Sequence, residues 1–273
     1  MQTEGLKIKE AKGMVTVIFP AAGKGKRMKS DINKVFLDLA GVPVLIRSLL
    51  RFSSCPKVDN LVVVVAEAEV KSTQSLLQKT PGLKPWQVVA GGSERQYSVL
   101  NGIKSLPDAR DDDIILVHDA ARPLVSVKTI EGVIDMAIRE GSAIAAVPAK
   151  NTIKVCDAEG RVVNTPDRAT LWEVQTPQGF KRSVLLAANK QAIAEDLLGT
   201  DDASLVERLG LPVYVVESDY GNIKITTPVD ILMAKSILAD TLEELQLQKL
   251  LAKSAEAMGE AISSLRDAFK GFK

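Results

Sequence analysis

Residues 14–28, with the sequence MVTVIFPAAGKGKRM, join a short hydrophobic run to a loop that carries two glycines and three cations. The apolar run has the length and composition of a buried β-strand. Gly23 and Gly25 allow backbone amides to approach an anion closely, and the neighbouring lysines and arginine add positive charge. The stretch therefore predicts a strand followed by a glycine turn that holds a polyphosphate, with a purely structural turn as the alternative.

Two common nucleotide-binding motifs do not match this loop. The third glycine of a dinucleotide fingerprint, G-x-G-x-x-G, would fall at Met28. The phosphate-loop pattern G-x-x-x-x-G-K-[ST] is absent. The loop is therefore interpreted as a glycine turn of another nucleotide-binding type.

Further runs rich in valine and isoleucine recur along the chain and are separated by longer segments with helical periodicity. Such an alternation is typical of a mostly parallel sheet covered by helices on both faces. We therefore predict an α/β, Rossmann-like fold. The expected strands are Met14–Phe19, Leu61–Val65, Val88–Val89, Ile114–Val117, Ala143–Val147 and Val213–Val216, with a further short strand at Asn222–Thr226.

One segment interrupts this alternation. The sequence NTIKVCDAEGRVVNTPDRATLW contains two β-prone runs on either side of a turn that ends in Gly160. It predicts a β-hairpin arm at about residues 149–172. No linker or internal repeat divides the rest of the sheet-forming chain, so residues 1–240 are expected to form one domain.

The segment after residue 240 has a different pattern. Apolar residues recur there at intervals of three and four without a proline, which predicts an amphipathic helical extension over residues 241–273. This extension either docks on its own domain or contacts another subunit.

The composition excludes several classes of protein. The chain has 273 residues, a formal net charge of +1 and few aromatic residues, which argues against nucleic acid as a partner. Cys55 and Cys156 lack metal-ligand spacing, as expected in a reducing compartment. The sequence shows no membrane-spanning run and no leader-like segment, so we expect a cytoplasmic protein that does not enter a membrane.

Other polar groups follow the predicted strands. Lys34 lies in a charged loop before a helix, and Lys224 lies in the last predicted strand. Asp119 follows the strand Ile114–Val117 and is suited to Mg²⁺, which prefers oxygen ligands and often shares them with phosphates. The chain's one histidine, His118, is assigned either a buried hydrogen-bonding role or a catalytic role.

Five blocks, in this order, resemble the 2-C-methyl-D-erythritol 4-phosphate cytidylyltransferases of the non-mevalonate isoprenoid pathway. The resemblance covers roughly residues 15–238. The blocks are PAAGKGKRM, GGSERQYSV, HDAARP, TDDASLVE and NIKITTPVD.

The resemblance implies that CMP is transferred from CTP to the phosphate of 2-C-methyl-D-erythritol 4-phosphate, with Mg²⁺ and release of pyrophosphate. It implies that Arg27 and Lys34 stabilise charge on the α-phosphate. It also implies that Arg168 and Lys224 position the acceptor, and that Thr152 and Asp119 complete the acceptor pocket and metal region. The residues implied to line the CTP site are Ala21, Ala22, Gly23, Gly25, Gly91, Gly92, Ser98 and Arg122.

The resemblance further implies a homodimer in which the hairpin arm carries Arg168 into the partner's site. Two alternatives remain at this stage. One is a cytidylyltransferase for another polyol phosphate, such as ribitol 5-phosphate. The other is a non-catalytic nucleotide-binding protein.

Overall fold

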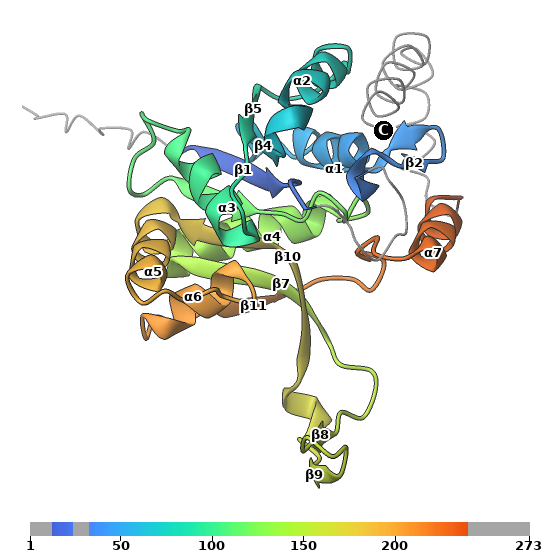
Figure 1. The fold of residues 1–273 in the computed structure, drawn as a ribbon, viewed down its shortest axis with the longest axis vertical. Coiled ribbons are helices and arrows are strands. Elements are labelled where there is room, and N and C mark those ends of the chain that lie inside the picture. The colour runs from blue at the N-terminus through green and yellow to red at the C-terminus, as the bar shows by residue number, and fades with distance from the viewer. Residues whose placement is uncertain (1–12, 24–32, 240–273) are drawn as a thin grey trace, which may run out of the picture.

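The computed structural model describes residues 13–23 and 33–239, which form a sheet between two layers of helices with an arm projecting from one end (Figure 1). Arg27, Gly25 and the predicted extension at 241–273 lie outside the described residues. The division of the chain at residue 240 therefore stays a prediction.

Seven strands form the central sheet in the order β11-β7-β10-β6-β1-β4-β5. The pairs β1–β4, β1–β6, β4–β5 and β7–β11 are parallel, whereas β10 is antiparallel to both of its neighbours. This confirms the predicted α/β class and mostly parallel sheet. The strands are β1 (Val15–Pro20), β4 (Asn60–Val65), β5 (Trp86–Ala90), β6 (Ile114–Val117), β7 (Ser142–Pro148), β10 (Trp172–Lys181) and β11 (Tyr214–Glu217).

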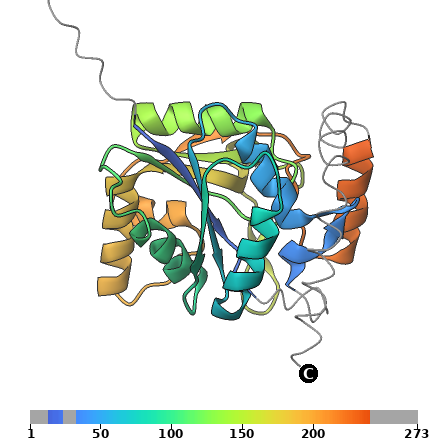
Figure 2. The ribbon, with the colours of Figure 1, turned by 90° about the horizontal axis from the view of Figure 1, so that it is seen from above.

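Helices cover both faces of the sheet because successive side chains of its buried strands point to opposite sides. In β1, Val17 and Phe19 pack with one helical layer, and Ile18 packs with the other. Figure 2 shows the sheet between these layers. The first layer contains α1 (Val44–Ser53), α2 (Val70–Gln78) and α4 (Val127–Glu140), and the second contains α3 (Arg95–Lys104), α5 (Arg182–Ala194) and α6 (Asp202–Arg208).

Smaller elements complete the described fold. A third apolar cluster joins Leu39, Val44 and Ile225 to α7 (Pro228–Ala239). Short hairpins are formed by β2 (Asp38–Leu39) with β3 (Val42–Pro43), and by β8 (Val155–Cys156) with β9 (Val162–Asn164). The 3-10 helices are η2 (Lys34–Phe36), η3 (Glu67–Glu69) and η4 (Arg168–Thr170).

The predicted arm is present and lies between β7 and β10 (Figure 1). Its tip is the β8–β9 hairpin, and Gly160 adopts a φ of 82°, in the left-handed region that glycine tolerates. The structure therefore confirms the hairpin and its turn residue.

One expected strand is absent, and one strand of the sheet was not predicted. Residues 222–226 form no strand, although the amide of Ile225 donates to the carbonyl of Ala121. Conversely, β10 was not predicted, because it contains Pro177 and Gly179 and lacks a continuous Val/Ile run. Its pairing with β7 shifts register between Val174 and Gln178, which is a bulge of the kind found beside functional sites.

Within the described residues, no helix is long and apolar enough to cross a membrane.

Candidate functional site

The ends of four neighbouring parallel strands, β6, β1, β4 and β5, place the predicted loops at one edge of the sheet. Ala21, which follows β1, donates its amide to Val64 of β4, and Gly91, which follows β5, donates to Val65. On the other side of β1, the amide of His118 donates to Ile18. These bonds bring the glycine turn, the GGSER segment and the HDAAR segment to one edge of the sheet, where open α/β folds bind ligands.

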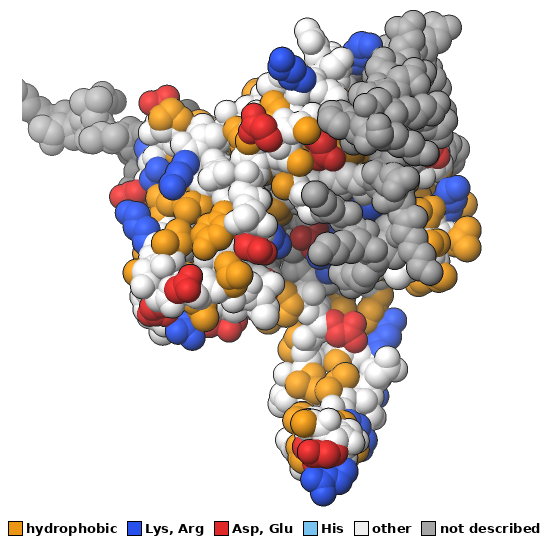
Figure 3. Space-filling view, viewed as in Figure 1, with side chains coloured by type: hydrophobic (Ala, Val, Ile, Leu, Met, Phe, Trp, Pro, Cys, Tyr) orange, Lys and Arg blue, Asp and Glu red, His pale blue; other side chains and the backbone are white. Residues whose placement is uncertain are grey.

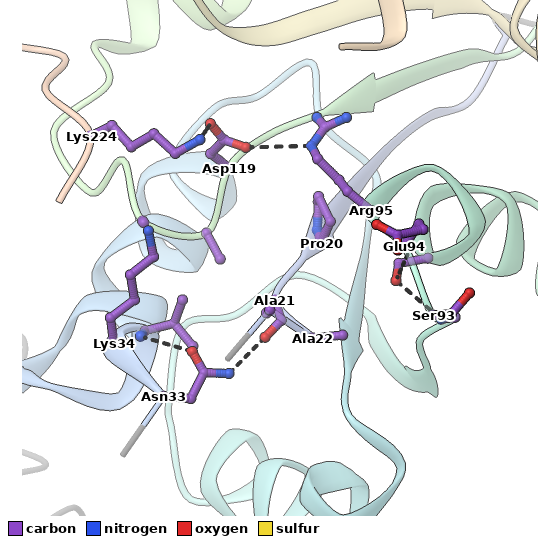
Figure 4. Close-up of a pocket in the computed structure, with 16 residues that line it drawn as sticks. Pro20, Ala21, Ala22, Asn33, Lys34, Ser93, Glu94, Arg95, Asp119 and Lys224 are labelled. Atoms are coloured by element: carbon purple, nitrogen blue, oxygen red, sulfur yellow. Dashed lines mark hydrogen bonds and ion pairs between the residues drawn. The ribbon is translucent and has the colours of Figure 1, made fainter. Parts of the chain in front are cut away.

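A pocket of about 280 Å³ opens at this edge (Figure 4). Its floor and rim combine the ends of β1 and β6, the start of η2 and the start of α3. The lining residues are Pro20, Ala21, Ala22, Gly23, Asn33, Lys34, Val35, Gly92, Ser93, Glu94, Arg95, Ser98, Asp119, Ala120, Ala121 and Lys224.

Asp119 is the most strongly constrained charge in the pocket. Its Oδ2 lies 2.8 Å from Nζ of Lys224 and 3.6 Å from Nε of Arg122, and its Oδ1 lies 3.8 Å from Nε of Arg95. Burial by itself would raise the pKa of Asp119, but the charges of Lys224 and Arg95 outweigh burial and hold this pKa well below its usual range. Asp119 therefore remains a carboxylate at any physiological pH.

The bulged strand β10 holds Asp119 and the Lys224 segment in place. Thr176 Oγ1 accepts a hydrogen bond from the amide of Asp119 at 3.0 Å. The side-chain amide of Asn222 donates to Oε1 of Gln175 at 2.8 Å and to the carbonyl of Thr176 at 2.9 Å. Because Asn222 is fully buried, these bonds fix the backbone two residues before Lys224.

Lys34 reaches the pocket because Asn33 fastens its segment to the glycine turn. The Asn33 side chain donates to the carbonyl of Ala21 at 2.8 Å, and its Oδ1 accepts from the amide of Val35 at the start of η2. In Figure 4, Lys34 and Lys224 extend toward the same hollow from different segments of the chain.

Close packing leaves no room for a side chain at Gly91 and Gly92, which follow β5. A Cβ on Gly91 would lie 2.6 Å from Cβ of Ala22, and one on Gly92 would lie 2.4 Å from Cβ of Tyr97. The amide of Gly92 donates to Oγ of Ser98 at 3.1 Å, which ties the loop to the first turns of α3. Of this pair, Gly92 lines the pocket and Gly91 packs behind it.

Besides Gly91, three predicted site residues among the described residues lie outside the pocket lining. The Arg122 side chain is partly buried, and its Nη1 donates to the carbonyl of Asn222 at 2.7 Å. Thr152 and Arg168 are exposed on the arm, where Nη1 of Arg168 donates to the carbonyl of Lys150 at 3.0 Å. Arg168 lines a separate hollow at the base of the arm with Lys150 and Trp172.

His118 has the buried hydrogen-bonding role. It is fully buried, and its Nε2 lies 3.0 Å from the carbonyl of Arg122 while its Nδ1 lies 3.1 Å from Oγ1 of Thr176. Burial lowers its pKa to about 4, so it is neutral at physiological pH. It does not line the pocket.

Arg95 is a pocket residue to which sequence reasoning assigned no role. It lies in the GGSERQYSV block, which was the available signal in the sequence. In the fold it is the first residue of α3 and forms an ion pair with the buried Asp202, with 2.7 Å between Nη1 and Oδ2.

The sequence profile of the 2-C-methyl-D-erythritol 4-phosphate cytidylyltransferase family matches residues 15–240. The chain belongs to this family. A 2-C-methyl-D-erythritol 4-phosphate cytidylyltransferase from Geotalea uraniireducens is 48% identical over 225 residues, which are 82% of this chain and 96% of the relative. One from Symbiobacterium thermophilum is 47% identical over 229 residues, which are 83% of this chain and 93% of the relative.

A solved structure supports the same assignment. The 4-diphosphocytidyl-2C-methyl-D-erythritol synthase of Anaerococcus prevotii superimposes with a TM-score of 0.73 at 28% identity, covering 83% of this chain and 99% of that one. The protein is therefore an enzyme, a nucleotidyltransferase of the cytidylyltransferase family.

Proposed function

We propose that the pocket at the sheet edge transfers CMP from CTP to 2-C-methyl-D-erythritol 4-phosphate. The observation that carries this proposal is the convergence of Lys34, Lys224 and Asp119 on the glycine turn of a chain that belongs to this family. An oxygen of the acceptor phosphate attacks the α-phosphorus of CTP, the bond from that phosphorus to the β-phosphate oxygen breaks, and pyrophosphate leaves.

The reaction needs positioning and charge neutralisation more than proton transfer. A phosphate monoester is already anionic at neutral pH, so its attack requires no general base. This agrees with a neutral, buried His118 outside the pocket lining. Cations that interact more strongly with the transition state than with the bound substrates lower the barrier and so accelerate the reaction.

We assign roles to the pocket residues on this basis. Lys34, with Arg27 from outside the described residues, stabilises charge that develops at the α-phosphate, and Lys224 positions the acceptor phosphate. Ala21, Ala22, Gly23, Gly92 and Ser98 bind the nucleotide, with Gly25 assigned there from sequence. Gly91 and Arg122 support that surface from behind, because both lie outside the lining.

A single magnesium ion fits at Asp119. No cluster of three or more potential ligand side chains (His, Cys, Asp or Glu) occurs among the described residues, but Mg²⁺ bound to a nucleotide needs only one or two carboxylates, with phosphates and water as its other ligands. Oδ1 of Asp119 is not held within hydrogen-bond distance by Arg95, whereas Oδ2 is held by Lys224. When bound, the ion would offset the charge of the triphosphate.

We further propose that the enzyme is a homodimer in which each arm brings Arg168 and Thr152 to the partner's pocket. The arm exposes aliphatic side chains, visible in Figure 3, and Val162 and Val163 are each more than half exposed. A two-stranded hairpin is marginal in water without further packing, and an exposed apolar patch marks an interaction surface. A cytoplasmic location stays a prediction from sequence.

The proposal is tested by pyrophosphate release from CTP and Mg²⁺ with 2-C-methyl-D-erythritol 4-phosphate, ribitol 5-phosphate or glucose 1-phosphate as acceptor. We expect release with the first acceptor. Lys34→Ala should lower kcat by about 100- to 1,000-fold, the effect of losing one transition-state donor. Release only with ribitol 5-phosphate would move the enzyme to another pathway, and CTP binding without release would support a non-catalytic protein.

A further inference from the structure

Asp202 is a buried carboxylate that the proposed reaction does not use. It is the first residue of α6, and only 1% of its surface is exposed. A buried carboxylate is costly unless it is paired. Its partner is Arg95, which belongs to the pocket lining, so the interaction connects the second helical layer to the site.

The Arg95 guanidinium lies between two carboxylates that belong to different parts of the fold. Nη1 is 2.7 Å from Oδ2 of Asp202, whereas Nε is 3.8 Å from Oδ1 of Asp119. The first is a charge-assisted hydrogen bond, and the second is too long for one. In Figure 4, Arg95 points toward Asp119 from the side opposite Lys224.

The hydrogen bond between Arg95 and Asp202 determines which oxygens of Asp119 remain available to other groups. Arginine–carboxylate pairs are frequently bidentate, and a bidentate pair with Arg95 would use both oxygens of Asp119. Lys224 already holds one of them at 2.8 Å. Anchoring Arg95 at Asp202 therefore leaves the Asp119–Lys224 contact intact and leaves Oδ1 available.

We propose that Asp202 is a positioning residue for the pocket. It holds the Arg95 guanidinium beside Asp119, so that the remaining N–H donors of Arg95 face the nucleotide phosphates. Among residues 13–23 and 33–239, Asp202 is the one hydrogen-bond partner of that guanidinium. The arginine is ordered before the nucleotide arrives, so binding does not have to restrict it. The inference rests on the proposed function, since the anion in question is the triphosphate.

The test compares Asp202→Asn with Asp201→Asn. The first substitution introduces a side chain that is nearly isosteric with the native one but lacks the charge that holds Arg95. Asp201 caps α6 through the amide of Ser204 and accepts from Gln178. An asparagine in place of Asp201 keeps the cap through its one carbonyl oxygen but sets an amide donor opposite Nε2 of Gln178. This control therefore removes a neighbouring carboxylate charge and one hydrogen bond of α6, and leaves the hydrogen bond between Arg95 and Asp202 in place.

We expect Asp202→Asn to lower kcat by about 100-fold, as a misplacement of about 1 Å does. It should also weaken CTP binding, measured by calorimetry, by at least about 10-fold, the effect of losing one charge-assisted hydrogen bond. Asp201→Asn should leave both quantities within about two-fold of the wild type, because the hydrogen bond between Arg95 and Asp202 is retained. Equal kinetics and binding for the two variants, at a temperature where both are folded, would show that the Arg95–Asp202 pair only anchors α6.

A second variant keeps the inference testable if Asp202→Asn does not fold. Arg95→Lys retains the positive charge but cannot span both carboxylates, so it should lower kcat and CTP affinity to a similar degree. The double variant should be no worse than either single one, because both remove the same unit. If the loss of activity in the double variant equals the product of the two single losses, the inference is wrong. An inactive wild type would reject the proposed function, whereas the CTP-binding comparison would still test the role of Asp202.

Discussion

At the scale of single residues, the pocket keeps one buried carboxylate ionised by surrounding it with cations. Asp119 is 9% exposed, and Lys224, Arg122 and Arg95 all lie within 4 Å of its oxygens. Removing Lys224 would leave this charge with partners only at 3.6 Å and beyond. The groups that we propose to bind phosphate therefore also maintain the site in its absence.

The two cysteines differ in burial, and we therefore expect them to differ in reactivity. Cys55 is fully buried, and burial raises the pKa of its thiol, whereas Cys156 is exposed on the arm. Because the thiolate is the reactive form, we expect iodoacetamide at pH 8 to modify Cys156 first. Cys55 should react more than about 1,000-fold more slowly, since it must wait for unfolding of a domain of ordinary stability.

Mass spectrometry after timed quenching measures both rates. In Cys156→Ser, only the slow reaction should remain. A Cys55 that reacts as fast as Cys156 in native protein would contradict the burial argument.

At the scale of elements, α3 carries Arg95 and Ser98, and its position depends on a close approach to the sheet at Gly102. A Cβ there would lie 2.8 Å from Cγ2 of the buried Ile18 in β1. Alanine favours a helix over glycine by about 1 kcal/mol, but overpacking a core costs about 1–3 kcal/mol. We predict that Gly102→Ala lowers the free energy of unfolding by about 1 kcal/mol and raises the KM for CTP by moving α3.

Gly132→Ala in α4 is the matched control, measured by urea unfolding and steady-state kinetics. Its added Cβ would meet only Cγ1 of the partly buried Val216, at 3.0 Å, so helix propensity has more weight there. We expect its stability to be unchanged or slightly higher and its kinetics to be unchanged. If both glycines behave alike, the approach of α3 to β1 does not control the site.

The strand β10 also acts at this scale, because it shapes the site through its irregularity. A regular strand would alternate its side chains between the two faces. The bulge instead directs Gln175 and Thr176 to the loops after β6 and before α7, where they bind Asn222 and the amide of Asp119.

At the scale of the whole molecule, one chain does not bring all the proposed site residues together. Lys34 and Lys224 share the pocket, whereas Arg168 lies on the arm at a separate hollow. If the arm serves the partner subunit, mixed dimers of Lys34→Ala and Arg168→Ala each contain one intact site. Equal mixing with random exchange should then restore about a quarter of wild-type turnover, because half of the dimers are mixed and each has one of two sites.

A second mixture provides the control for this prediction. Lys34→Ala and Lys224→Ala damage the same pocket, so every site in their mixed dimers lacks one lysine, and turnover should not recover. Purification with two different affinity tags verifies that mixed dimers form. Verified mixed dimers of the first pair without activity would disprove the shared site.

The sequence predicted those parts of the fold that depend on local pattern. The run from Val15 is buried on both faces, so an apolar strand of this kind is recognisable without knowledge of its neighbours. Gly160 marked the turn of the arm because the left-handed backbone favours glycine. By contrast, Asn222–Thr226 has the alternation of a strand but lacks a neighbouring strand to pair with.

The sequence by itself determined the fold class, the arm, the family and the segments that meet at the sheet edge, because each depends on residue type and spacing along the chain. Only the tertiary structure decided that Arg122 lies behind the pocket, that Arg168 lies apart from it, and that Asp202 reaches Arg95 across 107 positions of the chain. These are contacts between segments distant in sequence. Their geometry depends on how helices and strands pack together, and local patterns do not encode that packing.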